Sequence, residues 1–157
     1  MELLIMEKEE KQKIYCAIRK NWLIATPEEL VRQQAIQLLI QHLGFPRSCI
    51  AVEKELQSLP HMKIYTSLLP ERRADIICYL PKENSLHPLL LIECKAVPLS
   101  SKEILQVIGY NRFIKASFIA LINQTEHKLG WFDPELSDYQ FVNYLPFYSE
   151  LVNSLIN

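Results

Sequence analysis

The first clear periodicity of apolar positions along the chain follows Thr26. Four aliphatic residues recur there at the spacing of one helical face: Val31, Ala35, Leu38 and Leu39. Thr26 suits an N-cap, Pro27 the first helical position, and Glu29 the acidic position of a capping box. Because Gly44 and Pro46 interrupt the pattern, the sequence predicts a helix that begins after Thr26 and ends before Gly44.

Three runs with the character of β-strands come next. The first, Ile50 to Leu56, alternates between apolar and polar residues, and the second is Arg73 to Leu80. The third, Leu89 to Cys94, is almost continuously apolar, as expected of a strand that is covered on both faces. Between the last two, Pro81 to Pro88 is polar and rich in turn residues, which predicts the loop of a hairpin.

Beyond these strands the helical spacing returns and is followed by further apolar runs. The pattern predicts a helix from about Ser101 to Ala116 and a strand from Phe118 to Ile122. Shorter strands are expected at Trp131 to Phe132 and Gln140 to Val142, and a closing helix at Tyr148 to Ile156. The order helix, three strands, helix, strand predicts a mixed α/β sandwich.

The length of 157 residues is that of a single domain. We expect its core at about residues 26–123, with a helical N-terminal extension over residues 1–25 and a C-terminal extension over residues 124–157.

Composition adds a constraint on what the domain binds. With a net charge of -1 and a pI near 6.4, the chain lacks the basic excess that is usual in nucleic-acid binders. If it binds DNA, its basic residues must gather on one side, or a partner or a metal must help. The 4 cysteines show no CxxC spacing, which argues against zinc and favours a reducing compartment. Since no signal peptide or membrane-spanning run is visible, we expect a soluble, cytoplasmic protein.

The candidate chemistry lies at the end of the most apolar strand. Side chains alternate along a strand, so Glu93 and Lys95 should point to one face and Cys94 to the other. Together with Asp75 on the preceding strand, Glu93 could hold Mg²⁺ or Mn²⁺ through carboxylate oxygens, and the Cys94 carbonyl could add a ligand. Lys95 could orient a water or stabilise charge on a phosphate during hydrolysis.

This spacing alone favours a structural interpretation. A pair of charged residues at a strand end often forms an ion pair, here Glu93 with Lys95 or Arg73 with Asp75. A buried acid at the end of so apolar a strand needs such a partner, or a metal, in either case.

The surrounding motifs narrow the choice, because they resemble a known family in content and in order. Asp75 lies in Arg73-Ala74-Asp75-Ile76, and Glu93 lies in Leu91-Ile92-Glu93-Cys94-Lys95-Ala96. The other segments are Thr26 to Gln33, Gly44-Phe45-Pro46, Val52-Glu53-Lys54, Gln106-Val107-Ile108-Gly109-Tyr110-Asn111, and Asn123 after a strand. The set resembles the PD-(D/E)XK nucleases, and in particular the N-terminal nuclease domain of type I restriction enzyme R subunits. The resemblance implies a restriction-endonuclease-like αβββαβ core, with a mixed central sheet flanked by helices.

Roles for individual residues follow from the resemblance. It implies that Asp75 and Glu93 are the metal-binding acids and Lys95 the catalytic lysine. It places Gln106 and Tyr110, four residues apart on one helix, beside the site for DNA contact or support of the acids.

The family also contributes a metal-binding glutamate from the first helix, for which Glu28 and Glu29 compete. Glu28 lies three and seven residues before Val31 and Ala35 and so should share their inward face, whereas Glu29 is placed to reach back to Thr26. We therefore expect Glu28 as the ligand and Glu29 as the cap.

Two further expectations concern DNA. A phosphate-facing surface could be formed by Arg72, Arg73, Arg112 and Lys115, with Lys102 as a weaker candidate, although an ordinary solvated face explains them equally well. R subunits carry helicase motors after the nuclease, and this sequence has none, so cutting should be autonomous or directed by a protein partner that supplies specificity.

The leading hypothesis is therefore a Mg²⁺-dependent nuclease acting on DNA. The alternative is a catalytically silent module of the same fold for DNA binding or protein docking. RNA or branched DNA as the substrate also remains open.

Overall fold

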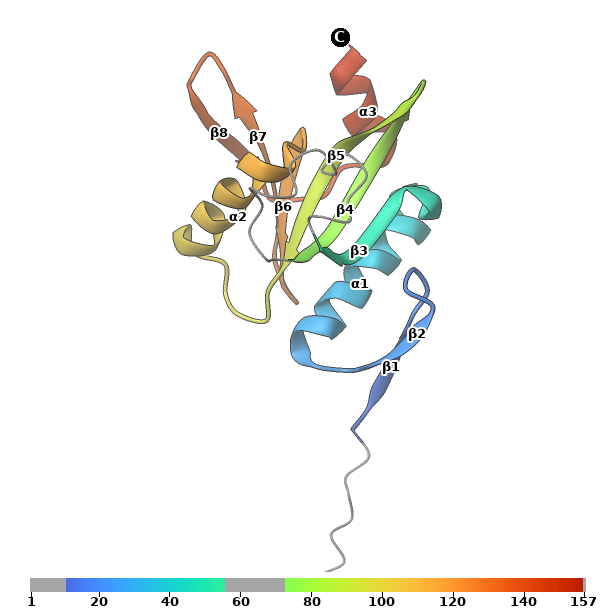
Figure 1. Cartoon of the computed structure of the whole chain (residues 1–157). Helices are drawn as coiled ribbons and strands as arrows, with labels where there is room; N and C mark the ends of the chain where they lie inside the picture. Colours follow the sequence, from blue (N-terminus) through green and yellow to red (C-terminus); the bar gives the residue numbers. More distant parts are fainter. Residues whose placement is uncertain (1–10, 56–72, 157) are drawn as a thin grey trace, which may run out of the picture.

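The structure, a computed structural model, describes residues 11–55 and 73–156 (Figure 1). Its helices are α1 (Pro27–Gln41), α2 (Ser101–Ile114) and α3 (Tyr148–Ile156), with a short 3₁₀ helix, η1 (Arg47–Cys49). Its strands are β1 (Lys13–Cys16), β2 (Asn21–Ile24), β3 (Ile50–Glu55), β4 (Arg73–Lys82), β5 (Ser85–Cys94), β6 (Phe118–Ile122), β7 (His127–Asp133) and β8 (Asp138–Val142).

The fold is built on a six-stranded sheet whose order, β3-β4-β5-β6-β7-β8, follows the chain. Every neighbouring pair is antiparallel except β5 and β6, which are parallel and joined through α2. Helix α1 packs its apolar stripe on one face of the sheet, and α2 covers the other (Figure 1). The expected mixed α/β class, with a mixed sheet between helices, is confirmed.

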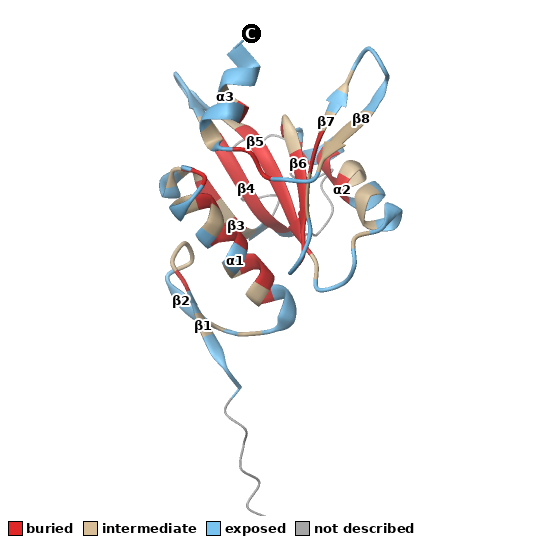
Figure 2. Cartoon of the chain, turned by 180° about the vertical axis from the view of Figure 1, so that it is seen from behind, coloured by how far each residue is buried: buried red, intermediate tan, exposed pale blue. Residues whose placement is uncertain are grey.

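The central strands are apolar because both faces of the sheet are covered (Figure 2). On β5, Leu90 and Ile92 pack toward α1, whereas Leu91 between them packs toward α2. Leu89 to Cys94 is buried throughout, which confirms the expectation from its continuous apolar run.

The hairpin between β4 and β5 is longer than its sequence predicts. The polar run Pro81 to Pro88 was expected to be a loop, but the strands stay paired as far as Lys82 and Ser85, and only Glu83 and Asn84 turn. This part of the ribbon is mostly exposed, so its pairing needs no apolar alternation. Strands β7 and β8 are also longer than the short segments predicted for them.

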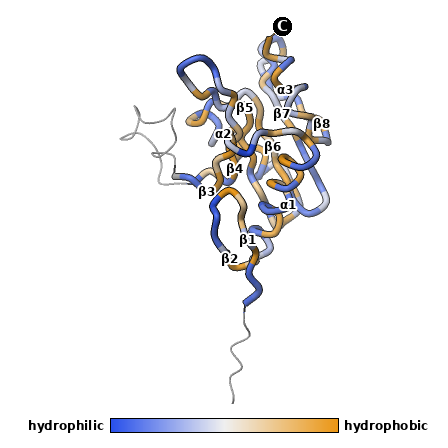
Figure 3. Tube along the Cα trace, turned by 90° about the vertical axis from the view of Figure 1, so that its right-hand side faces the viewer, coloured by the Kyte–Doolittle hydropathy of each residue, from blue (hydrophilic) through white to orange (hydrophobic). Residues whose placement is uncertain are grey.

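The expected helical N-terminal extension is wrong in its described part, which is the β1–β2 hairpin beside α1 (Figures 1 and 3). Tyr15 pairs with Trp22 across the hairpin, with ring centroids 5.4 Å apart, and Cys16 is buried against the α1 side of the core. Aromatic and β-branched residues favour strands, and this preference outweighs the charged residues nearby. No helix among the residues described is long and apolar enough to span a membrane.

Gly130 of β7 gives a test of this packing, because the ring of its cross-strand partner Phe141 lies directly over it. A Cβ added at Gly130 would lie 2.5 Å from Phe141 Cε1. We expect Gly130→Ala to lower the free energy of unfolding by about 1–3 kcal/mol through overpacking, as measured by urea denaturation.

The matched control is Gly109→Ala in α2, where an added Cβ meets no atom within 4 Å. This change should raise the free energy of unfolding by about 0.5–1 kcal/mol, because alanine favours a helix over glycine. Equal effects of the two substitutions would contradict the packing described for Gly130.

Candidate functional site

The site begins where two central strands separate. Pairing between β4 and β5 ends at Ile76 and Ile92, so Asp75 and Glu93 are the next residues on the two strands. There the Asp75 side chain replaces the backbone of β4 as hydrogen-bond acceptor, because its Oδ2 accepts a hydrogen bond of 2.8 Å from the backbone N–H of Cys94. On its other side, β5 stays paired with β6 as far as Cys94. Asp75 is thus fixed against the backbone between Glu93 and Lys95.

Both acids at this sheet end are removed from water. Asp75 is 6% exposed and Glu93 5% exposed, while Lys95 is half-buried. Leu91, two residues before Glu93, packs toward α2, so strand alternation directs Glu93 to that side. A buried carboxylate is costly unless a cation or hydrogen-bond donors compensate it, so this end of the sheet requires nearby positive charge.

Arg32 of α1 supplies that charge, a role that was not predicted from the sequence. Its NH2 nitrogen lies 2.8 Å from Asp75 Oδ1 and 2.9 Å from Glu53 Oε1. Its NH1 nitrogen lies 2.9 Å from Glu29 Oε2, and Glu29 Oε1 is 2.6 Å from NH2 of Arg19. We call Arg19, Glu28, Glu29, Arg32, Glu53 and Asp75 the carboxylate–arginine cluster. The available signal was a charged residue inside the apolar stripe of the helix.

The charged groups of this cluster shift each other's pKa values. Burial lowers the pKa of Arg32, but the hydrogen bond and charge of Asp75, followed by Glu29 and Glu53, outweigh it and raise the pKa above its ordinary value. Burial, together with a hydrogen bond to Asp75, raises the pKa of Glu53 to about 7. The cluster sets two guanidinium groups against four carboxylates, so it retains an excess of negative charge.

Glu53 is a second residue of the cluster whose role was not predicted, although it belongs to the Val52-Glu53-Lys54 motif. It has φ 52°, a left-handed conformation that is unfavourable for a residue with a side chain. Its neighbours Val52 and Lys54 keep their register with β4, so the unusual backbone is confined to Glu53. The side chain reaches Arg32 from this position.

The two glutamates at the start of α1 are arranged opposite to the expectation. Thr26 Oγ1 accepts from the Glu29 backbone N–H at 3.2 Å, which confirms the N-cap. However, the Glu29 side chain is the buried one and binds both arginines, whereas the Glu28 side chain is 50% exposed. Glu29 continues the buried line through Arg32 and Ile36, whereas the inward face was predicted from Val31 and Ala35 alone.

The expected pair on α2 is divided between the surface and the core. Gln106 is exposed, whereas Tyr110 is 3% exposed and packs in the same cluster as Leu91 and Leu121. Leu121 is the strand partner of Glu93, so Tyr110 lies on the side of the sheet to which Glu93 is directed.

Cys94 is a small core residue, as expected. Its side chain is fully buried on the α1 side, and burial raises the pKa of its thiol, which Asp75 and Glu93 raise further. Its carbonyl as a metal ligand stays a prediction.

Asn123 secures the loop that follows Lys95. Its Nδ2 donates to the carbonyl oxygen of Val97 at 2.9 Å, and its Oδ1 accepts from the backbone N–H groups of Thr125 and Glu126 at 2.9 and 2.7 Å. The side chain thereby joins the β5–α2 loop to the β6–β7 turn and steadies the backbone after the site.

The basic residues expected to face phosphate do not gather around this site. Arg72 lies outside the described residues, and Arg73 is exposed at the start of β4, two residues from Asp75. Arg112 and Lys115 are exposed too, but at the C-terminal end of α2. Because α2 runs back along the sheet and Ser117 bonds Pro88 near the start of β5, this end lies away from the acids. Among the described residues, Arg73 therefore lies apart from Arg112 and Lys115, while Lys102 lies in the first turn of α2, at the nearer end.

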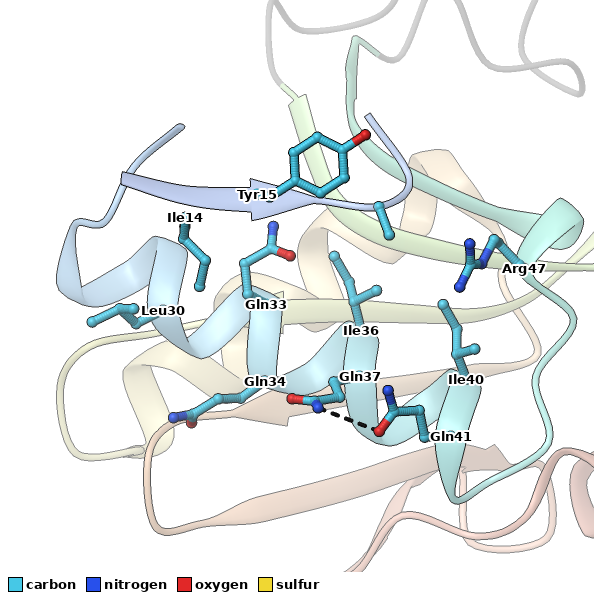
Figure 4. Close-up of a pocket in the computed structure, with 11 residues that line it drawn as sticks. Ile14, Tyr15, Leu30, Gln33, Gln34, Ile36, Gln37, Ile40, Gln41 and Arg47 are labelled. Carbon is cyan, nitrogen blue, oxygen red and sulfur yellow. Dashed lines mark hydrogen bonds between the residues drawn. The ribbon is translucent and has the colours of Figure 1, made fainter. Parts of the chain in front are cut away.

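A separate groove of about 280 Å³ runs between β1 and α1 (Figure 4). Its walls combine aliphatic side chains with a row of four glutamines on α1: Gln33, Gln34, Gln37 and Gln41. None of the site residues predicted from the sequence lines it.

The side chains at the sheet end could hold only a cation that needs few ligands from the protein. Within the described ranges, no group of three or more His, Cys, Asp or Glu side chains is placed to hold a metal ion. Mg²⁺ needs only one or two carboxylates, because it keeps several waters. Asp75 and Glu93, the next residues after the last paired positions of β4 and β5, are the two carboxylates that would hold such a cation.

A six-stranded mixed sheet flanked by helices is consistent with a nuclease-like α/β domain. The family model described as type I restriction enzyme R protein N terminus matches residues 27–146, and the chain belongs to this family. Neither the curated proteins nor the solved structures include a significant match.

The pKa of Glu53 gives a test of the carboxylate–arginine cluster. Since this pKa rises from 4.5 to about 7 on folding, the folded chain binds more protons than the unfolded chain between these pH values. The free energy of unfolding should therefore fall as the pH rises through this window. Glu53→Gln should flatten the fall and be more stable than wild type at pH 8, as measured by urea denaturation in EDTA.

Glu28→Gln is the matched control, because it removes a half-exposed acid from the same cluster. It should leave the slope between pH 4.5 and 7 close to that of wild type. A Glu53→Gln profile parallel to wild type would show that Glu53 is not the titrating group.

Proposed function

We propose that the chain is a Mg²⁺-dependent nuclease domain that hydrolyses DNA phosphodiester bonds. The observation that carries the proposal is the hydrogen bond from the Cys94 backbone N–H to Asp75, which fixes that acid between Glu93 and Lys95 at one sheet end. Membership of the restriction enzyme R protein family supports a nuclease role and DNA as the substrate.

In this proposal Asp75 and Glu93 hold the metal, with the Cys94 carbonyl as a further oxygen donor. Mg²⁺ or Mn²⁺ supplies Lewis acidity that activates water and neutralises charge on the scissile phosphate. Lys95, half-buried and one residue beyond Cys94, orients the attacking water and stabilises the charge that develops on the phosphate oxygens. Burial of both acids keeps bulk water away and strengthens these interactions.

Other residues have supporting roles. Tyr110 packs on the Glu93 side of the sheet and helps to hold that acid, whereas the exposed Gln106 is available to contact DNA. Glu29, buried against both arginines, replaces Glu28 as the α1 acid that supports the site from inside. Arg73 is the basic residue best placed to meet a phosphate. Because Arg112 and Lys115 lie away from the acids, a protein partner would supply DNA specificity.

One observation favours the catalytically silent alternative. Asp75 already has a cationic partner in Arg32, at 2.8 Å, so the fold accommodates this acid without any metal. A DNA-binding or protein-docking module could retain the same ion pairs for stability alone. Metal binding and cleavage discriminate between the two functions.

The nuclease proposal is tested by substitutions that preserve shape. Asp75→Asn and Glu93→Gln should lower the rate of Mg²⁺-dependent cleavage of plasmid DNA by about 100-fold or more, because each removes a metal-binding charge. Lys95→Met should lose cleavage to a similar extent yet retain Mn²⁺ binding in calorimetry.

Lys115→Met is the matched control, since Lys115 caps the far end of α2 and should leave cleavage unchanged. Circular dichroism should show that all four variants fold. Undiminished cleavage in both Asp75→Asn and Lys95→Met would refute the assignment. If folded wild type neither cleaves nor binds Mn²⁺, with or without DNA, the docking module becomes the better explanation.

A further inference from the structure

Arg32 is an unusual residue for its place in the fold. It lies in the buried stripe of α1 beside Val31 and close to Ala35, and is itself only 7% exposed. Burial of a guanidinium is costly, so its position must be stabilised by the groups around it. Those groups come from three separate elements, namely α1, β3 and β4.

One nitrogen of Arg32 serves more acceptors than it has hydrogens. NH2 lies 2.8 Å from Asp75 Oδ1, 2.9 Å from Glu53 Oε1 and 3.3 Å from Glu28 Oε1. A guanidinium NH2 group carries two hydrogens, so these three contacts cannot all be full hydrogen bonds. The three carboxylate oxygens lie around NH2 as they would lie around a cation, and all three are attracted by the positive charge of the guanidinium.

The position of NH2 conflicts with a metal at Asp75. Each carboxylate oxygen of Asp75 has two lone pairs, and one of those on Oδ2 is already used by the Cys94 N–H. Oδ1 already carries the guanidinium. Two cations on one carboxylate oxygen repel each other strongly in a buried site, so each lowers the affinity of the other.

We propose that Arg32 is the resident cation of this site and competes with the divalent metal for Asp75 Oδ1. The proposal rests on the proposed function, because it assumes the metal site at Asp75 and Glu93. Without metal, Arg32 neutralises the buried acid and allows the chain to fold. When metal binds, NH2 releases Asp75, while NH1 keeps its contact with Glu29, so the side chain shifts without leaving the cluster.

This competition predicts that removing the guanidinium strengthens metal binding. Mn²⁺ is titrated calorimetrically into wild type and Arg32→Gln, without nucleic acid, and thermal unfolding is followed at each Mn²⁺ concentration. We expect Arg32→Gln to melt below wild type in EDTA, because its acids lose their partner. It should bind Mn²⁺ at least about ten-fold more tightly, and Mn²⁺ should raise its melting temperature more than that of wild type.

Arg19→Gln is the matched control. The NH2 of Arg19 lies 2.6 Å from Glu29 Oε1, whereas Arg32 binds the other carboxylate oxygen of Glu29, Oε2. This variant should bind Mn²⁺ within about two-fold of wild type, because it removes the same charge without freeing Asp75 Oδ1.

A second comparison covers the case in which Arg32→Gln does not fold. Arg32→Gln/Glu53→Gln removes one acid together with the guanidinium and so offsets the lost charge. It should bind Mn²⁺ more tightly than Glu53→Gln alone, for the same reason as the single variant.

The outcomes separate this inference from the function on which it rests. Tighter binding without Arg32 supports the inference, including the case in which only the variants bind Mn²⁺. If wild type binds Mn²⁺ and loss of Arg32 leaves the affinity equal or weaker, competition is wrong, while the metal site stands. If no protein binds Mn²⁺ at millimolar concentration, with or without DNA, the metal site and the competition fall together.

Discussion

The architecture depends on the ion pair between Arg32 and Asp75, because it joins the first helix to the one place where the central strands separate. Asp75 gives one oxygen to the guanidinium and the other to the backbone of β5. A single carboxylate therefore links α1, β4 and β5. Removing either partner would leave a buried charge without compensation, which costs more than the pair itself contributes. The candidate site is thus also a structural junction.

Much of the fold could be predicted from the sequence, because its strongest signals are local. Thr26 caps α1 as expected, and the continuous apolar run of β5 correctly indicated a strand covered on both faces. The N-terminal hairpin was missed because its short strands are largely exposed and follow a charged segment. The β4–β5 ribbon was underestimated because pairing beyond the sheet body leaves no hydrophobic alternation to detect.

The candidate site was predictable only in part. The spacing of Asp75, Glu93 and Lys95 identified the sheet end where they lie, but Arg32 and Glu53 join them through contacts between distant segments. The one local signal for Arg32 was its place inside the apolar stripe of α1, and that signal does not tell which acids it binds. The inversion of Glu28 and Glu29 has the same origin, since the inward face of α1 is defined partly by Arg32 rather than by aliphatic residues alone.

The hydrogen bond between Cys94 and Asp75 has a consequence for observing this protein. Because the amide proton of Cys94 points at the carboxylate and not at a neighbouring strand, its environment depends on what else that carboxylate binds. Its resonance in a nitrogen–proton spectrum is a native reporter inside the site, requiring no label beyond the isotope. Protonation of Asp75 or arrival of a cation would withdraw electron density from the carboxylate that accepts this proton, whereas loss of the arginine would increase it, so each of the three events would shift the same single peak.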